Sequence, residues 1–286
     1  MKSFHPISIL LVTFSLTEIP VFANVVLSVE DAAKKGLVKL SIKSKGGYTG
    51  DVIELKIQNL TNKKLDLRLE AGRRLDSKHQ NEQDILVTKE QEVFVNANQV
   101  KSVNVFGMCC QAHNSSPGEK HEYAVGHIAD SSLVKLAMFI DKNKYYTTYS
   151  AQQSVWVVSD GNSIGCISDD DKEIKNNLRK FVSKLTGKPI PLYDVTYQSG
   201  NDGSAMGRAV RIEGVFDYSL ATTCHATMAI YNASGEMVQL IFKDLESDKG
   251  EYNHYYIFRT KDLPQGEYYA RVEANGVLQK EMKIEF

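Results

Sequence analysis

Residues 37–58, LVKLSIKSKGGYTGDVIELKIQ, contain two runs in which apolar and polar side chains alternate. In 37–44 and again in 51–58, the apolar residues fall at every second position. A period of two means that a strand has one buried face and one wet face. Gly46 and Gly47 lie between the runs, where a tight turn needs them. The stretch therefore predicts two antiparallel strands of a half-buried sheet.

The same alternation continues through the first third of the chain. Further strands are expected at residues 64–70, 85–88, 92–96 and 100–108. Their spacing favours a layered antiparallel sheet or sandwich. The N-terminal region is thus predicted to be an antiparallel β domain.

Three helices are expected next, because apolar residues recur at helical spacing. Asp130 can cap the first helix, and the second covers about residues 151–159, with Gly161 near its end. The third has the clearest apolar stripe, over 174–185, and Gly187 ends it. We expect these helices to be appended to the N-terminal β domain.

The acidic run 169–171 precedes the third helix. Ser168 and Asp171 resemble a capping box, and negative charge is stabilising at the positive end of a helix dipole. We prefer this interpretation to a calcium site, because the alternating ligands of an EF-hand loop are absent.

Short alternating runs return in the last eighty or so residues, and six or seven strands in that length predict an Ig-like β-sandwich. Residues 198–207 are small, polar and glycine-rich, as domain boundaries tend to be. The predicted organisation is an N-terminal β-rich domain over 24–188, a linker over 189–207 and the sandwich over 208–286.

The chain begins like a secretory signal peptide. Lys2 precedes an apolar run over 7–16, which is too short for a bilayer span of roughly 20 residues. Val21 and Ala23 offer small side chains for cleavage after Ala23. We therefore predict a signal peptide over 1–23, and a secreted, periplasmic or cell-surface protein with no transmembrane segment after cleavage.

Two stretches of the C-terminal region resemble known modules. They are IYNASGEMV at 230–238 and LPQGEYYARV at 263–272, the latter followed by Asn275-Gly276 and a final KIEF. They look like the C-terminal Ig-like modules of bacterial secreted proteins, which include the type IX secretion sorting domain and the flagellar hook-capping Ig-like domain. The resemblance implies an Ig-like fold and a role in anchoring, secretion or partner docking. In the type IX version, the last domain would be removed on export.

Four stretches of the N-terminal region resemble an uncharacterised family of secreted bacterial proteins. They are LEAGRRL at 69–75, QDILV at 83–87, CCQA at 109–112 and AQQSVW at 151–156. This resemblance implies no activity. Arg73, Arg74, Gln83 and Asp84 could form a polar patch after a strand, but we prefer to interpret them as a solvated loop.

Composition excludes some classes of partner. The formal net charge is −1, and charges of both signs are well mixed. A nearly neutral surface gives no electrostatic reason to expect nucleic acid as a partner. A protein or glycan partner is expected instead.

The densest polar cluster contains five residues that could bind a metal: Cys109, Cys110, His113, His121 and His127. Their spacing matches no known zinc pattern, although thiolates and imidazoles are zinc ligands. We prefer a loop that is stapled by a disulfide, with Cys109 or Cys110 paired to Cys166, and we expect no cofactor. The alternative is a metal-dependent or thiol enzyme that uses the 109–127 loop.

These observations favour an exported, non-enzymatic interaction or surface protein, and no catalytic residue is assigned. The first measurement is the intact mass of protein purified from its own periplasm or medium, without reductant and with thiols alkylated. We expect a mass that begins at Asn24, with a disulfide and no metal. Bound zinc, or free thiols at Cys109 and Cys110, would instead favour the enzyme.

Overall fold

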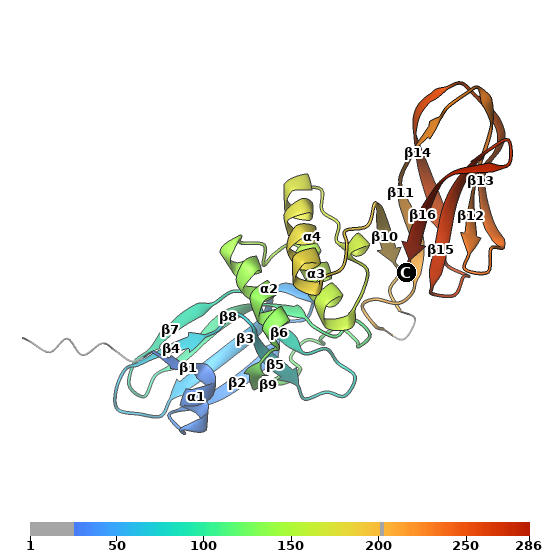
Figure 1. Cartoon of the computed structure of the whole chain (residues 1–286). Coiled ribbons are helices and arrows are strands. Elements are labelled where there is room, and N and C mark those ends of the chain that lie inside the picture. The colour runs from blue at the N-terminus through green and yellow to red at the C-terminus, as the bar shows by residue number, and fades with distance from the viewer. Residues whose placement is uncertain (1–25, 201–202) are drawn as a thin grey trace, which may run out of the picture.

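The computed structural model describes residues 26–200 and 203–286. It is 47% strand and 19% helix, so the predicted mainly β fold with some helix is confirmed. Figure 1 shows a β-barrel, a layer of helices and a β-sandwich, arranged in that order. None of the helices in the described part of the chain has the length and apolar character needed to cross a membrane. The predicted signal peptide lies outside the described residues.

The N-terminal sheet closes on itself. The barrel contains β2 (Val38–Ser44), β3 (Thr49–Asn59), β8 (Val100–Cys109), β6 (Ile85–Val87), β5 (Arg73–Ser77) and β9 (Glu122–Ile128), in that order. The two predicted strands pair with Ile42 opposite Leu55, and β9 closes the ring with Tyr123 opposite Ile42. The expected layered sheet is therefore wrong in detail, because the unpredicted strands β5 and β9 complete a barrel. Closure leaves no open edge in this ring.

A small second sheet covers the side of the barrel. It contains β1 (Leu27–Ser28), β4 (Leu65–Leu69) and β7 (Gln91–Val95), and helix α1 (Val29–Lys34) follows β1. The buried guanidinium of Arg73 pairs with Glu30 of α1 and donates to the carbonyl of Gly126, 3.0 Å away. This ion pair fixes α1 against the barrel.

The three predicted helices are confirmed. They are α2 (Ser131–Lys142), α3 (Tyr149–Asp160) and α4 (Lys172–Thr186), and a 3-10 turn, η1 (Ile164–Cys166), precedes α4. Asp130 caps α2 as predicted, and Gly161 and Gly187 end the other two with φ of 79° and 72°. The capping-box interpretation of Ser168 is wrong. Asp171 itself caps α4 by accepting from the N–H groups of Glu173 and Ile174.

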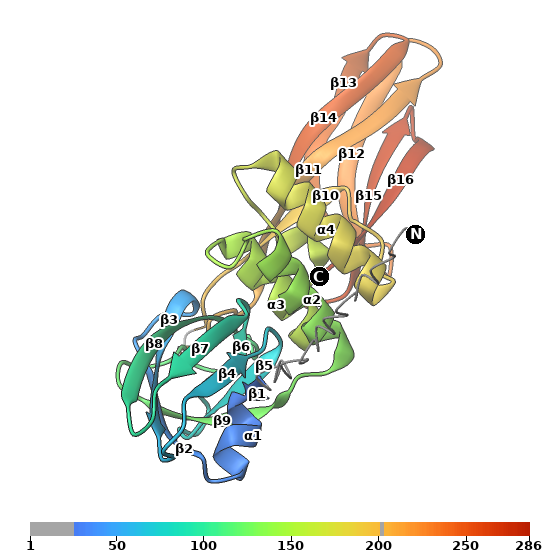
Figure 2. The same ribbon diagram turned by 90° about the vertical axis from the view of Figure 1, so that its left-hand side faces the viewer.

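Helix α3 is buried along most of its length. Residues 150–157 are all buried, and they include two serines and two glutamines. Trp156 is the largest fully buried side chain of the protein's described part. A helix with no exposed stripe must satisfy every buried polar group by hydrogen bonding. The helix therefore lies between the barrel and the rest of the helical layer, as both views show (Figures 1 and 2).

The C-terminal region is the predicted β-sandwich, with its own hydrophobic core. One sheet contains β10 (Tyr193–Tyr197), β11 (Ala209–Leu220) and β14 (Gly250–Arg259). The other contains β13 (Met237–Ser247), β12 (Cys224–Asn232), β15 (Glu267–Ala274) and β16 (Val277–Glu285). Strand β10 lies inside the range predicted as a linker.

Strand β10 joins the sandwich to the helical layer. It pairs with β11 on one side, and its Asp194 forms ion pairs of 2.7 Å with Arg179 and Lys175 of α4. Arg179 is buried and also donates to the carbonyls of Ile167 and Gly165, at 2.9 and 2.8 Å. A side chain at Gly165 would lie 2.9 Å from the Val195 side chain, so glycine permits this close approach.

The substitution Arg179→Met tests this junction. We expect it to lower the free energy of unfolding by about 2–3 kcal/mol, because two buried carbonyls and one carboxylate lose a charged donor. Urea unfolding followed by the fluorescence of Trp156, the single tryptophan, gives the measurement. Lys180→Met, on the exposed side of the same helix, is the control. Equal stability of the two variants would contradict the assigned role.

Candidate functional site

The predicted Cys–His cluster is divided among separate environments. Cys109 ends β8 and is buried with Cys110, whereas His113 is exposed in the following loop. His127 is exposed on β9, with its Nδ1 3.5 Å from the Glu30 carboxylate. No three His, Cys, Asp or Glu side chains in the described ranges are grouped so that they could hold a metal ion. The residues of the alternative zinc set are therefore not brought together.

The four cysteines, which all lie in the described ranges, are free and buried. The predicted disulfide between Cys109 or Cys110 and Cys166 is thus not formed in the structure. Burial raises the pKa of Cys109 and raises that of Cys110 and Cys166 to about 12. A nucleophilic cysteine needs its thiolate, and a raised pKa disfavours that form.

Two buried glutamines fix the chain around Cys109. The Gln152 amide of α3 donates to the Cys109 carbonyl at 2.7 Å and accepts from the Cys109 N–H at 3.0 Å. Gln83 accepts from Trp156 Nε1 at 3.2 Å. Gln83 and Asp84 are buried, so the expectation of a solvated loop there is wrong. Gln83 and Asp84 both accept hydrogen bonds from backbone or side-chain groups inside the protein.

His121 belongs to a cluster around a buried carboxylate. Glu82 accepts hydrogen bonds from Tyr123 at 2.7 Å, from Ser77 at 2.9 Å and from the Gly118 N–H at 3.2 Å, and it pairs with His121 Nδ1. Burial alone would raise the pKa of Glu82, but these hydrogen bonds outweigh it and hold the pKa below its ordinary value. The cluster ties the 111–121 loop to the barrel.

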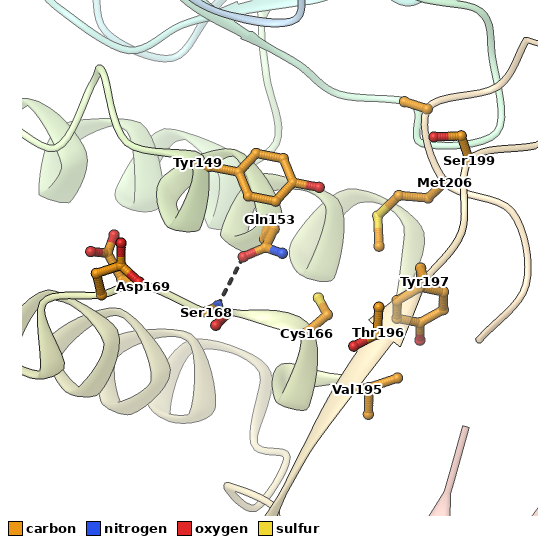
Figure 3. Close-up of a pocket in the computed structure, with 12 residues that line it drawn as sticks. Tyr149, Gln153, Cys166, Ser168, Asp169, Val195, Thr196, Tyr197, Ser199 and Met206 are labelled. Atoms are coloured by element: carbon orange, nitrogen blue, oxygen red, sulfur yellow. Dashed lines mark hydrogen bonds between the residues drawn. The ribbon is translucent and has the colours of Figure 1, made fainter. Parts of the chain in front are cut away.

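A cavity of about 500 Å³ lies where the helical layer meets β10 (Figure 3). A volume of this size is typical of small-molecule sites, roughly 300–1,000 Å³. Its lining comes from α3, the segment after η1, β10 and the loop that follows: Tyr149, Gln153, Cys166, Ser168, Asp169, Asp170, Val195, Thr196, Tyr197, Ser199, Ala205 and Met206. We take this helix–strand pocket as the candidate site, because buried polar groups and two tyrosines converge on it.

Gln153 is the most deeply placed polar residue of the helix–strand pocket. It is 8% exposed, and its Oε1 accepts from the Ser168 N–H at 2.8 Å. The amide NH₂ group turns to the cavity beside the Tyr149 hydroxyl (Figure 3). The hydrogen bond fixes the orientation of the amide, and the NH₂ group also interacts with the Tyr149 hydroxyl, so a ligand in the pocket would meet the two groups together.

The tyrosines contribute from two different elements. Tyr149 comes from α3 and packs edge-on against Trp156, with ring centroids 6.5 Å apart. Tyr197 comes from β10, and burial raises its pKa to about 12. Each ring thus presents an apolar face and a neutral hydroxyl, a combination that suits a ligand with both CH and OH groups.

A second cavity of about 720 Å³ lies between the 188–193 segment and the sandwich. It shares Tyr197 with the helix–strand pocket and includes the exposed His113. Its charged side chains largely pair with each other or with the backbone, as Lys188 does with the Gly161 carbonyl at 3.1 Å. Fewer polar groups are therefore available there for a ligand.

Sequence reasoning named Cys166 and the acids at 169–171 but missed the pocket. Tyr149 and Tyr197 lie almost fifty residues apart, and β10 was included in the predicted linker. The one local signal was the pair of glutamines at 152–153 among the apolar residues of the second predicted helix, since polar residues that become buried need a structural or binding partner.

Comparisons with known proteins do not assign the chain to a family. No protein-family model matches the chain, and no curated protein matches it. Among solved structures, one similarity is to "The structure of CBM51-2 in complex with GlcNAc and INT domains from Clostridium perfringens ZmpB". The identity is 11%, the match covers 86% of this chain and 78% of that chain, and the TM-score is 0.16. A similarity at this score carries no argument about fold or function.

The Glu82 cluster makes a pH-dependent contribution to stability. Because the pKa of Glu82 is lowered on folding, its contribution is present above the ordinary value of 4.5 and is lost as the pH falls through the folded value. We expect Glu82→Gln to lose about 1–3 kcal/mol at neutral pH and to show a flatter stability profile in acid. Denaturant unfolding at several pH values measures this. Glu54→Gln, at an exposed position of β3, should keep the wild-type profile, and an identical profile for Glu82→Gln would refute the assignment.

Proposed function

We propose that this chain is an exported, non-enzymatic binding protein that holds one sugar-sized, polyhydroxylated ligand in the helix–strand pocket. The observation that carries the proposal is the convergence of Tyr149 and Tyr197 with the oriented amide of Gln153 around a cavity of about 500 Å³. Sugar rings have CH faces that pack on aromatic rings and hydroxyl groups that need hydrogen-bond partners. Amides and tyrosine hydroxyls serve as those partners.

The lining supports binding more than catalysis. Acid–base chemistry commonly uses a histidine, lysine or carboxyl group whose pKa is shifted towards neutrality. The described lining contains no histidine or lysine, its carboxyl groups are those of Asp169 and Asp170, and its thiol, Cys166, has a pKa raised to about 12. The alternative enzyme would use Cys109 or Cys110, whose thiols are buried and protonated at neutral pH.

The Ig-like sandwich would serve anchoring, secretion or docking to a protein partner. Its resemblance to the C-terminal modules of secreted proteins supports this role. Strand β13 exposes Met237, Leu240 and Leu245, and exposed apolar groups on one strand are a common feature of docking surfaces. Export follows from the predicted signal peptide.

The test is a screen of the full chain without its first 23 residues against monosaccharides and short glycans. Binding changes the environment of Tyr149 and hence of Trp156, so tryptophan fluorescence and calorimetry both report it. We expect Tyr149→Ala to raise the Kd by at least tenfold, or about 1.4 kcal/mol, because the ligand loses an aromatic face. Tyr255→Ala, at an exposed tyrosine of the sandwich, is the matched control. Failure of every sugar to bind, or equal affinities for the two variants, would overturn the proposal.

A further inference from the structure

The helix–strand pocket carries charge of one sign. Among its lining residues, all within the described ranges, the acidic side chains are Asp169 and Asp170, and no lysine, arginine or histidine is present. Burial raises the pKa of Tyr149, and it raises that of Cys166 and Tyr197 to about 12, so these three groups are neutral. The lining therefore contributes two negative charges and no positive charge.

The first of these carboxylates has a fixed position. Asp169 Oδ2 accepts from the Ser150 hydroxyl at 2.5 Å, and Oδ1 accepts from the Asp171 N–H at 3.0 Å. Each carboxylate oxygen can accept a second hydrogen bond, so both retain capacity for a ligand. Figure 3 places Asp169 at the Tyr149 side of the cavity, across from Tyr197. A carboxylate held in this way needs little reorganisation to bind a cation.

Nearby positive groups are already engaged. Arg179 and Lys175 pair with Asp194, each at 2.7 Å, and Arg179 also donates to two buried carbonyls. The first N–H groups of α4 are capped by the Asp171 side chain. These groups are therefore not available to neutralise Asp169 and Asp170 on the cavity side.

The two tyrosines of the pocket also favour a positively charged ligand. The face of an aromatic ring is electron-rich and attracts a cation within about 6 Å of its centre. Tyr149 and Tyr197 are neutral rings on opposite sides of the cavity, and Gln153 supplies a donor for a hydroxyl group (Figure 3). Carboxylate, aromatic faces and an amide together form a set that suits a protonated amine on a polar ring.

We infer that the helix–strand pocket selects a sugar with a free, protonated amino group over neutral and acidic sugars of the same size. The inference rests on the proposed function, because it names the class of sugar that the same pocket takes. Acidic sugars are disfavoured by repulsion from Asp169 and Asp170. An N-acetylated sugar has lost the charge that the carboxylates recognise.

The experiment compares four probes by calorimetry at about pH 6, where an amino group is protonated and aspartates are ionised: glucosamine, glucose, N-acetylglucosamine and glucuronic acid. We expect the Kd of glucosamine to be about tenfold below that of glucose, and glucuronic acid to bind more weakly than glucose. The preference for glucosamine should shrink as salt is raised from about 0.05 to 0.5 M.

Variants assign the effect to the pocket. The double variant Asp169→Asn with Asp170→Asn should bind glucosamine and glucose within about twofold of each other. The single variant Asp170→Asn removes only the exposed carboxylate. It keeps the hydrogen bond between Ser150 and Asp169, so it tests the inference even if the double variant folds poorly. Glu173→Gln removes one exposed negative charge a few residues away, outside the lining, and should keep the wild-type preference.

The other outcomes of these binding measurements would overturn either the inference or the proposed function. Equal affinities for glucosamine, glucose and N-acetylglucosamine would overturn the inference and leave the proposed function standing. A glucosamine preference that survives in both aspartate variants would also overturn it. Absence of binding by all four probes and by the wider glycan screen would overturn the proposed function itself.

Discussion

The structure depends on burying a helix that carries polar side chains. Helix α3 has Ser150, Gln152, Gln153 and Ser154 in its buried stretch, and each has a partner. Burying such groups without hydrogen bonds would cost about 1–3 kcal/mol each. The partner of Gln152 comes from the barrel and those of Ser150 and Gln153 come from the segment before α4, whereas Ser154 donates to the Ser150 carbonyl of the same helix. The helix therefore fixes the distance between these two parts, and the pocket opens beside it.

Most of the secondary structure was predictable, because it depends on local periodicity. The alternating runs at 37–44 and 51–58 became β2 and β3, and the Asp130, Gly161 and Gly187 signals marked real helix ends. The barrel was not predicted. Strands β5 and β9 contain charged or small residues, such as Asp76 and Gly126, and only their pairing with distant strands makes them strands.

The site was harder to predict than the fold. The cysteines and histidines at 109–127 are close in sequence, but a strand end, a loop and a second strand separate them in space. Conversely, Tyr149 and Tyr197 line the same cavity only because β10, which follows α4 in the chain, packs beside η1. Gly165 permits this close packing. Arg179 was not singled out in the sequence, yet its buried guanidinium links α4 to the carbonyls of Gly165 and Ile167 and to the Asp194 carboxylate of β10. Sequence periodicity reports burial, but it does not report which buried groups face one another.

Strand β10 has a mechanical consequence. It is one strand of the sandwich, yet its Asp194 is tied to α4 and its Tyr197 forms a wall of the pocket. Part of a pulling force applied between the barrel and the sandwich passes through this strand. Such tension would act on the ion pair between Asp194 and Arg179 and on the distance between Tyr197 and Tyr149. A protein held at a surface by its C-terminal module would therefore lose the pocket under load, and its grip on a ligand would depend on the force across the junction.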